Sequence, residues 1–185
     1  MTAPLFAQIS VSLDGFIEDP DKNIDWMTED ASVDALHTRT LDEIGGMIFG
    51  RMAHAMIADF WIDAAGQTGL PSDLAQQTER MTALPKYVLT HGSDVGGWTQ
   101  SHAITLGDVA RLKAKATKPI AVFAGAGAIQ SVLGSGLIEE LRLIRYPVVL
   151  GGGTPLFAAD GKRRQLVPLG QEKFASGATL ERFRI

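Results

Sequence analysis

The order of apolar and amphipathic segments predicts an α/β sandwich whose mainly parallel sheet carries an antiparallel C-terminal hairpin. In the earlier part of the chain, short apolar runs alternate with segments in which apolar residues recur at helical spacing. Toward the C-terminus, strand-like runs follow one another directly. We find no repeat, linker or low-complexity tract, so the 185 residues are expected to form one domain over 1–185.

The chain is expected to open with a buried strand over 5–13, where apolar residues dominate. The next segment, 14–26, is polar and contains Gly15 and Pro20, so a turn-rich loop is expected there. A helix is expected over 28–45, since Val33, Leu36, Leu41 and Ile44 lie near helical spacing and two glycines end the segment.

The next apolar run, 47–50, is too short for a helix and predicts a strand. An amphipathic segment over 51–61 indicates a helix, and glycines with a proline make 62–73 a loop. A polar helix is then expected to run up to Pro85.

Short apolar runs predict strands at 86–90 and 101–106, separated by a glycine-containing loop at 91–100. A helix over 107–116 carries the one basic cluster, which alternates with apolar residues and indicates a solvated helix face.

The run at 119–124 predicts a strand that leads through small residues into a helix over 127–136. Alternating residues at 138–151 predict a partly exposed strand, a long glycine-rich loop follows, and 179–185 closes the chain as a strand.

Composition excludes several classes of protein. The chain has no cysteine, so it has no disulfide framework, thiolate metal site or cysteine nucleophile. A net charge of -4 argues against a nucleic-acid partner, and no window is apolar enough to span a bilayer. The histidines and carboxylates lack metal-ligand spacing, so no metal is expected. The N-terminus is typical of a first strand rather than a leader, and a soluble cytoplasmic protein is the simplest expectation.

Three strand-to-helix junctions carry candidate binding residues. Gly125, Ala126, Gly127 and Ala128 would expose helix N–H groups to an anion, or else allow tight helix packing. At the other two junctions, Gly50 precedes Arg51 and Thr90 precedes His91. Arg51 is suited to a phosphate monoester, or else forms a surface salt bridge.

The glycine cluster does not fit a Rossmann fingerprint. Gln130 stands where the third glycine is required, and Arg145 and Pro147 lie where an acidic residue is expected. No Gly-Lys-Ser/Thr follows, which also excludes a P-loop.

The order of these pieces resembles the dihydrofolate reductase-like superfamily, and more closely its branch related to the C-terminal reductase domain of riboflavin biosynthesis. The resemblance covers nearly the whole chain. It rests on Ser12-Leu13-Asp14-Gly15, on Gly50-Arg51, on the small-residue turn 124–128 and on the segment 147–157, PVVLGGGTPLF.

This resemblance implies a three-layer αβα sandwich and NADPH lying across the carboxyl ends of the strands. By analogy, residues 125–128 would contact the pyrophosphate, and Arg51 with Thr90 would take the 2′-phosphate side of the adenosine. Gly50 would belong to the same site. Asp14, Gly15 and Phe16 would form a mobile loop over the nicotinamide. Relatives also suggest a homodimer.

Two departures from the family pattern bear on function. Ala53 replaces the threonine usual after Gly-Arg, and His54 either substitutes for it or lies on the helix surface. In folate-reducing relatives a buried acid sits on the first helix, where this chain has Ala31. Asp30 and Asp34 flank that place, and Asp30 is either a substrate acid or a helix cap.

Other residues leave alternatives open. Asp14 is either a catalytic residue or a turn former. Trp26, Phe60 and Trp61 either wall a heterocycle pocket or pack in the core.

We therefore expect an NADPH-dependent reductase that transfers hydride to a small heterocycle, pyrimidine- or pterin-like, or to a carbonyl or imine. It is not expected to be a classical dihydrofolate reductase. The alternative is a catalytically inactive protein of the same fold that binds a nucleotide or another small molecule.

Overall fold

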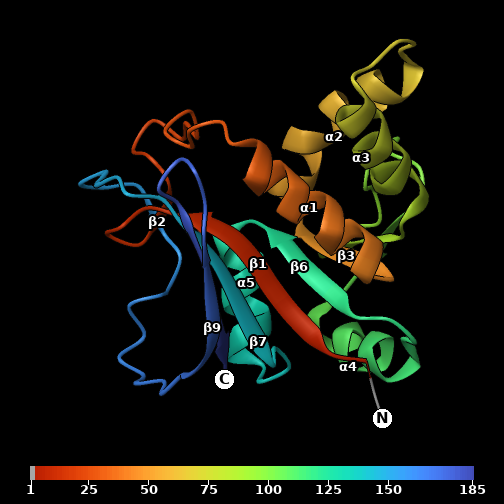
Figure 1. Cartoon of the computed structure of the whole chain (residues 1–185). Helices are drawn as coiled ribbons and strands as arrows, with labels where there is room; N and C mark the ends of the chain where they lie inside the picture. Colours follow the sequence, from red (N-terminus) through yellow and green to blue (C-terminus); the bar gives the residue numbers. More distant parts are fainter. Residues whose placement is uncertain (1–2) are drawn as a thin grey trace.

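A computed structural model of the protein describes residues 3–185 and contains an eight-stranded sheet in the order β5-β4-β3-β6-β1-β7-β10-β9 (Figure 1). The first six strands in that order are parallel, whereas β10 is antiparallel to both of its neighbours, β7 and β9. The strands are β1 (Leu5–Val11), β3 (Gly46–Gly50), β4 (Lys86–Leu89), β5 (Ser101–Ile104), β6 (Ile120–Ala124), β7 (Glu140–Arg145), β9 (Val167–Lys173) and β10 (Thr179–Arg184). The predicted parallel sheet and C-terminal hairpin are confirmed.

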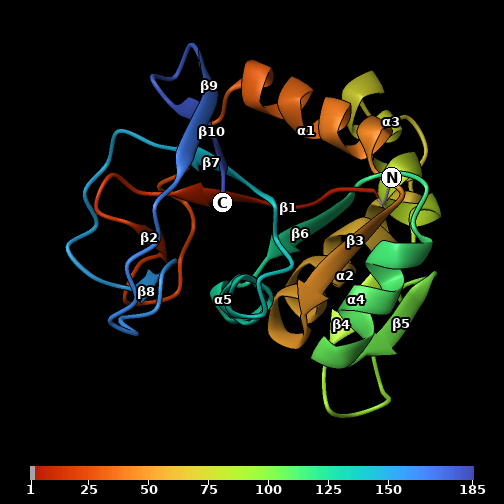
Figure 2. The same ribbon diagram turned by 90° about the horizontal axis from the view of Figure 1, so that it is seen from below.

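Five helices cover the two faces of the sheet: α1 (Ala31–Glu43), α2 (Arg51–Gly66), α3 (Ser72–Ala83), α4 (Leu106–Lys115) and α5 (Ala126–Gly134). α1, α2 and α3 lie on one face, and α4 and α5 lie on the other (Figure 2). The molecule is therefore an α/β sandwich of three layers.

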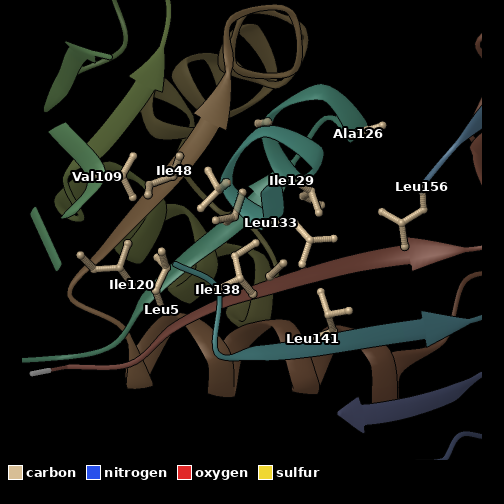
Figure 3. Packing of buried hydrophobic residues seen from close by; sticks show 14 of the residues in the cluster. Leu5, Ile48, Val109, Ile120, Ala126, Ile129, Leu133, Ile138, Leu141 and Leu156 are labelled. Atoms are coloured by element: carbon tan, nitrogen blue, oxygen red, sulfur yellow. The ribbon is translucent and has the colours of Figure 1, made fainter. Parts of the chain in front are cut away.

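Alternation along the strands explains how each layer is held. In β1, Leu5 and Ala7 point into the α4–α5 core, while Phe6 points into the core under α1 and α2. Ile129 and Leu133 of α5 are directed toward the strands in Figure 3. The two hydrophobic cores lie on opposite sides of one twisted sheet.

Several boundaries differ from the sequence prediction. α2 continues to Gly66, through residues expected to form a loop, because the alanines of that segment sustain the helix. The strand expected over 138–151 ends at Arg145, and the chain then turns at Pro147 and at Gly151, which has a positive φ of 72°.

Three strands were not anticipated by residue pattern. β2 (Phe16–Glu18) and β8 (Thr154–Pro155) form a separate two-stranded sheet. β9 is exposed at every position, and its sequence contains Pro168 and Gly170, two residues that are uncommon inside strands.

The sheet has a topological switch point between its neighbouring strands β3 and β6. After β3 the chain leaves into α2 on one face, and after β6 it leaves into α5 on the other. A crevice at the carboxyl ends of such strands is the usual ligand position in open α/β sheets. Within residues 3–185, no helix has the length and hydropathy needed to cross a membrane.

Candidate functional site

A cleft of about 1190 Å³ opens at the carboxyl edge of the sheet and continues inward beneath α1 and α2. Residues at the carboxyl ends of four parallel strands line it. They are Gly50, the last residue of β3, and Thr90, Thr105 and Gly125, which directly follow β4, β5 and β6. The outer part of the cleft is therefore built from strand ends and helix starts.

The N-termini of α2 and α5 contact each other at the switch point. A Cβ built on Gly125 would lie 3.4 Å from the Cβ of Ala53 in α2, and one built on Gly50 would lie 3.5 Å from the Cβ of Ala128 in α5. This reciprocal packing places two positive helix ends side by side on the cleft.

These two helix ends have no side-chain caps. α1 is capped by the Asp30 side chain, and α4 by a capping box of Thr105 and Asp108. α2 and α5 begin at Gly50 and Gly125 with no side-chain hydrogen bond to their first turns. α3 also begins uncapped, but its first turn does not line the cleft. The unpaired N–H groups of α2 and α5 are available to an anion.

The glycines of the turn have different roles. Gly125 has a φ of +88°, a conformation that other residues rarely adopt. A Cβ on Gly127 would meet nothing within 4 Å, so the absence of a side chain leaves open space above the helix end. In α5 the first intrahelical bond is donated by the N–H of Ala128, to the Gly125 carbonyl at 3.1 Å. The N–H groups before it have no intrahelical acceptor.

Arg51 is exposed at the start of α2 and extends toward the loop after β4. Its guanidinium Nη1 lies 4.0 Å from the Cβ position of Gly92, whose N–H donates to the Thr90 hydroxyl at 3.1 Å. Among residues 3–185, Arg51 has no carboxylate partner, which excludes the surface salt bridge considered above. Arg51, Thr90 and His91 together form a cationic, hydrogen-bonding corner of the cleft.

The inner part of the cleft is an apolar chamber between the sheet and the layer of α1, α2 and α3. We call it the inner chamber. Its walls are apolar side chains from the three helices and from β3 and β6: Leu41, Phe49, Ile57, Trp61, Met81 and Phe123. Its polar lining includes Gln8, Ser10, His37 and Gln77.

Gln8 and His37 line this chamber, and each has a buried polar side-chain atom without a hydrogen-bond partner among the described residues. Gln8 is 2% exposed, and its side-chain amide meets the hydroxyl of Thr40 at 3.0 Å, leaving one amide atom unbonded. The Nε2 atom of His37 is also buried and unbonded. Burial lowers the pKa of His37, opposed by the charge of Asp34, so its imidazole is neutral near pH 7.

Asp14 and Gly15 lie beside the cleft and are not among its lining residues. The Asp14 carboxylate accepts a hydrogen bond from the Ser12 hydroxyl at 2.7 Å and from two backbone N–H groups of the segment after β7. The Ser12 bond is the main reason that the pKa of Asp14 is lowered. Further along the loop, Ile17 and Glu18 do line the cleft. A catalytic role for Asp14 and a cofactor contact for Gly15 stay predictions.

Asp30 has the contacts of a helix cap. Its carboxylate accepts hydrogen bonds from the N–H of Ser32 at 2.8 Å and from the N–H of Ser176 at 2.7 Å. Bonds from Ser32 and Ser176 strongly lower its pKa. Neither Asp30 nor Asp34 lines the cleft, so the geometry gives Asp30 a structural task, and its catalytic role stays a prediction.

The structure corrects the prediction for His54. This residue is 3% exposed, contacts the rings of Phe49 and Trp98, and shares a 2.8 Å hydrogen bond with Ser101. It is neither a phosphate contact nor a helix-surface residue, because the face of α2 that carries it packs on the sheet.

The aromatic candidates have separate positions. Trp61 lines the inner chamber, Trp26 packs edge-on against Tyr146, and Phe60 is exposed.

Sequence reasoning missed Thr105, Gln8 and His37 as cleft residues. Thr105 lies between a strand and a helix, at a junction like those of the predicted site residues, so the junction pattern could have found it. Gln8 is a large polar residue inside a mainly apolar strand, and this signal is visible in the sequence. Nothing local marks His37. Among residues 3–185, no group of histidines and carboxylates could hold a metal ion.

Comparisons with known proteins agree with this geometry. The family model described as RibD C-terminal domain matches residues 3–180. The uncharacterized protein YyaP of Bacillus subtilis is 29% identical over 178 residues, which cover 94% of this chain and 90% of YyaP.

Two solved structures are similar over nearly their full lengths. A putative riboflavin biosynthesis protein from Shewanella sp. PV-4 has a TM-score of 0.70 at 22% identity, with 100% of this chain and 99% of that chain covered. Dihydrofolate reductase from Enterococcus faecalis, solved with NADP(H), has a TM-score of 0.60 at 14% identity, with 100% and 98% covered. At these identities the likeness shows the fold, which is dihydrofolate reductase-like, as the sequence resemblance implied.

Proposed function

The chain belongs to the RibD C-terminal domain family, and on that basis we propose that it is an NADPH-dependent reductase of a small ring or carbonyl-type substrate. One observation carries the proposal. A single cleft joins two uncapped helix N-termini at its outer end to an apolar chamber at its inner end. An anionic dinucleotide suits the first part, and a planar substrate suits the second.

The residues fit the cofactor in a specific order. N–H groups at the starts of α2 and α5 would hold the pyrophosphate, and the small residues Gly125 to Ala128 would let it approach the backbone. Arg51 and Thr90 would hold a phosphate on the adenosine ribose. Ala53 packs against Gly125 and offers no hydroxyl, so backbone groups take the part of the missing threonine.

When bound, the nicotinamide supplies hydride, and the residues of this chain position the two reactants. The inner chamber excludes water from the transfer through its aliphatic and aromatic walls. Glu18 is the one carboxylate among the described lining residues, and it is engaged by Lys22 and Thr154. The chamber therefore lacks the buried acid with which folate-reducing relatives handle a pterin.

The same lack of an acid favours a second candidate, an inactive protein that binds a nucleotide at this site. The two differ in turnover. A reductase oxidises NADPH when a suitable substrate is present, whereas an inactive protein binds NADPH but oxidises none with any member of a broad panel of pterins, pyrimidines and imines.

The cofactor site is tested by a matched pair of substitutions at Gly127. Gly127→Asp places a carboxylate at the start of α5 in open space, where it favours the helix and repels a pyrophosphate. We expect unchanged or higher thermal stability and a loss of NADPH affinity on the order of a hundredfold. Gly127→Asn, of the same size but uncharged, should bind NADPH nearly as wild type does. Equal NADPH affinity of the Asp variant and wild type would contradict the proposed site.

A further inference from the structure

Two residues that line the inner chamber, Gln8 and His37, each have a side-chain polar atom that lacks a hydrogen-bond partner in the described part of the chain. Buried polar groups in native proteins nearly always have a hydrogen-bond partner, and an unsatisfied one costs stability. Besides Gln8 and His37, one other described side chain has such an atom, Trp98, and it does not line the cleft. The two unsatisfied groups of the chamber are therefore candidates for ligand contacts.

The Gln8 amide can present either of its ends to a ligand. The single proton of the Thr40 hydroxyl is shared between two acceptors, the Leu36 carbonyl at 2.9 Å and Gln8 at 3.0 Å. If the proton goes to Leu36, Gln8 donates its N–H to Thr40 and its carbonyl oxygen is left free. If it goes to Gln8, the amide nitrogen is left free. Thr40 thus fixes the position of the amide but not its polarity.

His37 lies near Gln8 because of how α1 crosses β1. The Thr40–Gln8 contact joins the two elements, and Glu43, three residues later in α1, binds Arg142, the register partner of Gln8 in β7. α1 ends at Glu43, and the chain then enters β3 at Gly46, which is level with Leu5 at the start of β1 because both pair with Ile120. The helix therefore runs against the strand direction, and His37 stands one turn, about 4.5 Å, nearer the carboxyl edge than Thr40. As a neutral imidazole it offers a donor or an acceptor, according to its tautomer.

Two other polar groups near the chamber, Gln77 and Arg142, are already engaged. Gln77 donates to the Asp34 carbonyl at 3.2 Å and to the Thr38 hydroxyl at 3.0 Å. Arg142 is neutralised by Glu43, at 2.9 and 3.0 Å, and by Glu140 at 2.9 Å. Of the described residues that line the whole cleft, Glu18, Lys22 and Arg51 carry full charges, and none of them lies on β1 or α1.

We propose that Gln8 and His37 form the polar end of a substrate subsite for an uncharged, planar ring that presents an amide edge, a ring carbonyl next to a ring N–H. Such an edge offers one acceptor and one donor, which two neutral, adaptable groups can satisfy together. The aromatic and aliphatic walls would cover the two faces of the ring. This inference rests on the proposed function, because it assigns the substrate end of the same cleft.

The subsite disfavours a phosphorylated substrate. A phosphate entering the inner chamber would lose its hydration without meeting a cation, and this loss is costly. Arg51 stands at the opposite end, beside Thr90 and Gly92. The chamber therefore selects a neutral ring over a ring that carries a phosphate.

The probes are 4-quinazolinone, which has an amide edge, and 3-methyl-4-quinazolinone, in which a methyl group replaces the N–H of that edge. Uridine 5′-monophosphate serves as the phosphorylated probe. Each is titrated calorimetrically into the protein with and without saturating NADP⁺. We expect 4-quinazolinone to bind about tenfold more tightly than its methyl derivative, and the nucleotide to bind no more tightly than that derivative in the presence of NADP⁺.

Single substitutions test whether Gln8 and His37 contact the ring. Gln8→Leu and His37→Leu should each lower the affinity for 4-quinazolinone about tenfold and leave the affinity for the methyl derivative unchanged. Gln76→Leu and His102→Leu remove the same groups from exposed positions outside the cleft and should change neither affinity. The ¹⁵N shift of His37 Nε2 should also move on addition of 4-quinazolinone, a signal that a purely structural role would not give.

Each outcome bears on one claim. Equal binding of the two quinazolinones to wild type overturns the amide-edge subsite, and so does tight binding of the phosphorylated probe in the presence of NADP⁺. These results need no variant, so they stand even if Gln8→Leu fails to fold. Tight NADP⁺ binding without any 4-quinazolinone binding overturns the inference alone, whereas failure to bind NADP⁺ or NADPH overturns the proposed function.

Discussion

The carboxylate of Asp14 accepts a hydrogen bond from the backbone N–H of Gly151 at 2.8 Å, and so joins the loop after β1 to the segment after β7. The N–H of Leu150 binds the same carboxylate at 3.1 Å, and the N–H of Leu13 donates to the Val148 carbonyl at 2.8 Å. The short sheet of β2 and β8 continues this connection to Thr154, which lines the cleft. Two segments far apart in sequence are thus fastened together beside the site.

Asp14→Ala should release this connection, because Leu150 and Gly151 lose their shared acceptor. We expect faster amide hydrogen exchange at both residues and no change in the exchange of β1. Asp21→Ala, at an exposed position of the same loop, is the control and should leave both amides unaffected. Unchanged exchange in the Asp14 variant would show that the carboxylate does not hold the two segments together.

Gly125→Ala should destabilise the fold by about 1–3 kcal/mol, because alanine is strained at a φ of +88° and a ψ of 115°. The added methyl would also press on Ala53 and shift the paired helix ends, so NADPH affinity should fall. Gly134→Ala, at the last residue of α5 with nothing within 4 Å, should be neutral or slightly stabilising. Chemical denaturation measures both variants, and equal stabilities would contradict the role given to Gly125.

Because Lys86 is buried, we expect the stability of the fold to rise with pH in the alkaline range. Burial lowers the pKa of Lys86 from 10.5 to about 8, while its Nζ atom donates to the carbonyls of Leu84 at 2.7 Å and Thr82 at 3.2 Å. Between these pH values the unfolded chain holds more protons than the folded one, so this residue makes the free energy of unfolding increase with pH.

Lys86→Met should remove that increase between pH 8 and 10.5, whatever its effect on stability at pH 7. Lys115→Met, at an exposed position of α4, should leave the pH profile as it is in wild type. Urea denaturation at several pH values measures the difference. Parallel pH profiles of stability for wild type and Lys86→Met would contradict the lowered pKa of Lys86.

The outer part of the site could be predicted because it depends on local patterns. A strand that ends in glycine and continues into a helix is visible in sequence, and the structure places Gly50 and Gly125 together at the switch point. Only the sheet order reveals that these two junctions are neighbours, since β3 and β6 are separated by much of the chain.

The inner part could not be predicted for a related reason. Gln8 and His37 lie on different elements, and their unsatisfied atoms become apparent only once Thr40 and the chamber walls are in place. The prediction for His54 was wrong for the opposite reason. Its position one turn after Arg51 suggested that the two side chains lie on the same face of the helix. The helix instead turns His54 into the core beside Trp98.

Whether the two uncapped helix ends and Arg51 hold NADPH is decided by titrating the wild-type protein and Arg51→Ala with NADPH and NADH side by side. We expect wild type to bind NADPH more tightly than NADH. We also expect Arg51→Ala to lose NADPH affinity by on the order of tenfold to a hundredfold, with little change for NADH. Binding of neither dinucleotide to the wild-type protein would contradict the proposed cofactor site, and the cleft would then serve another ligand.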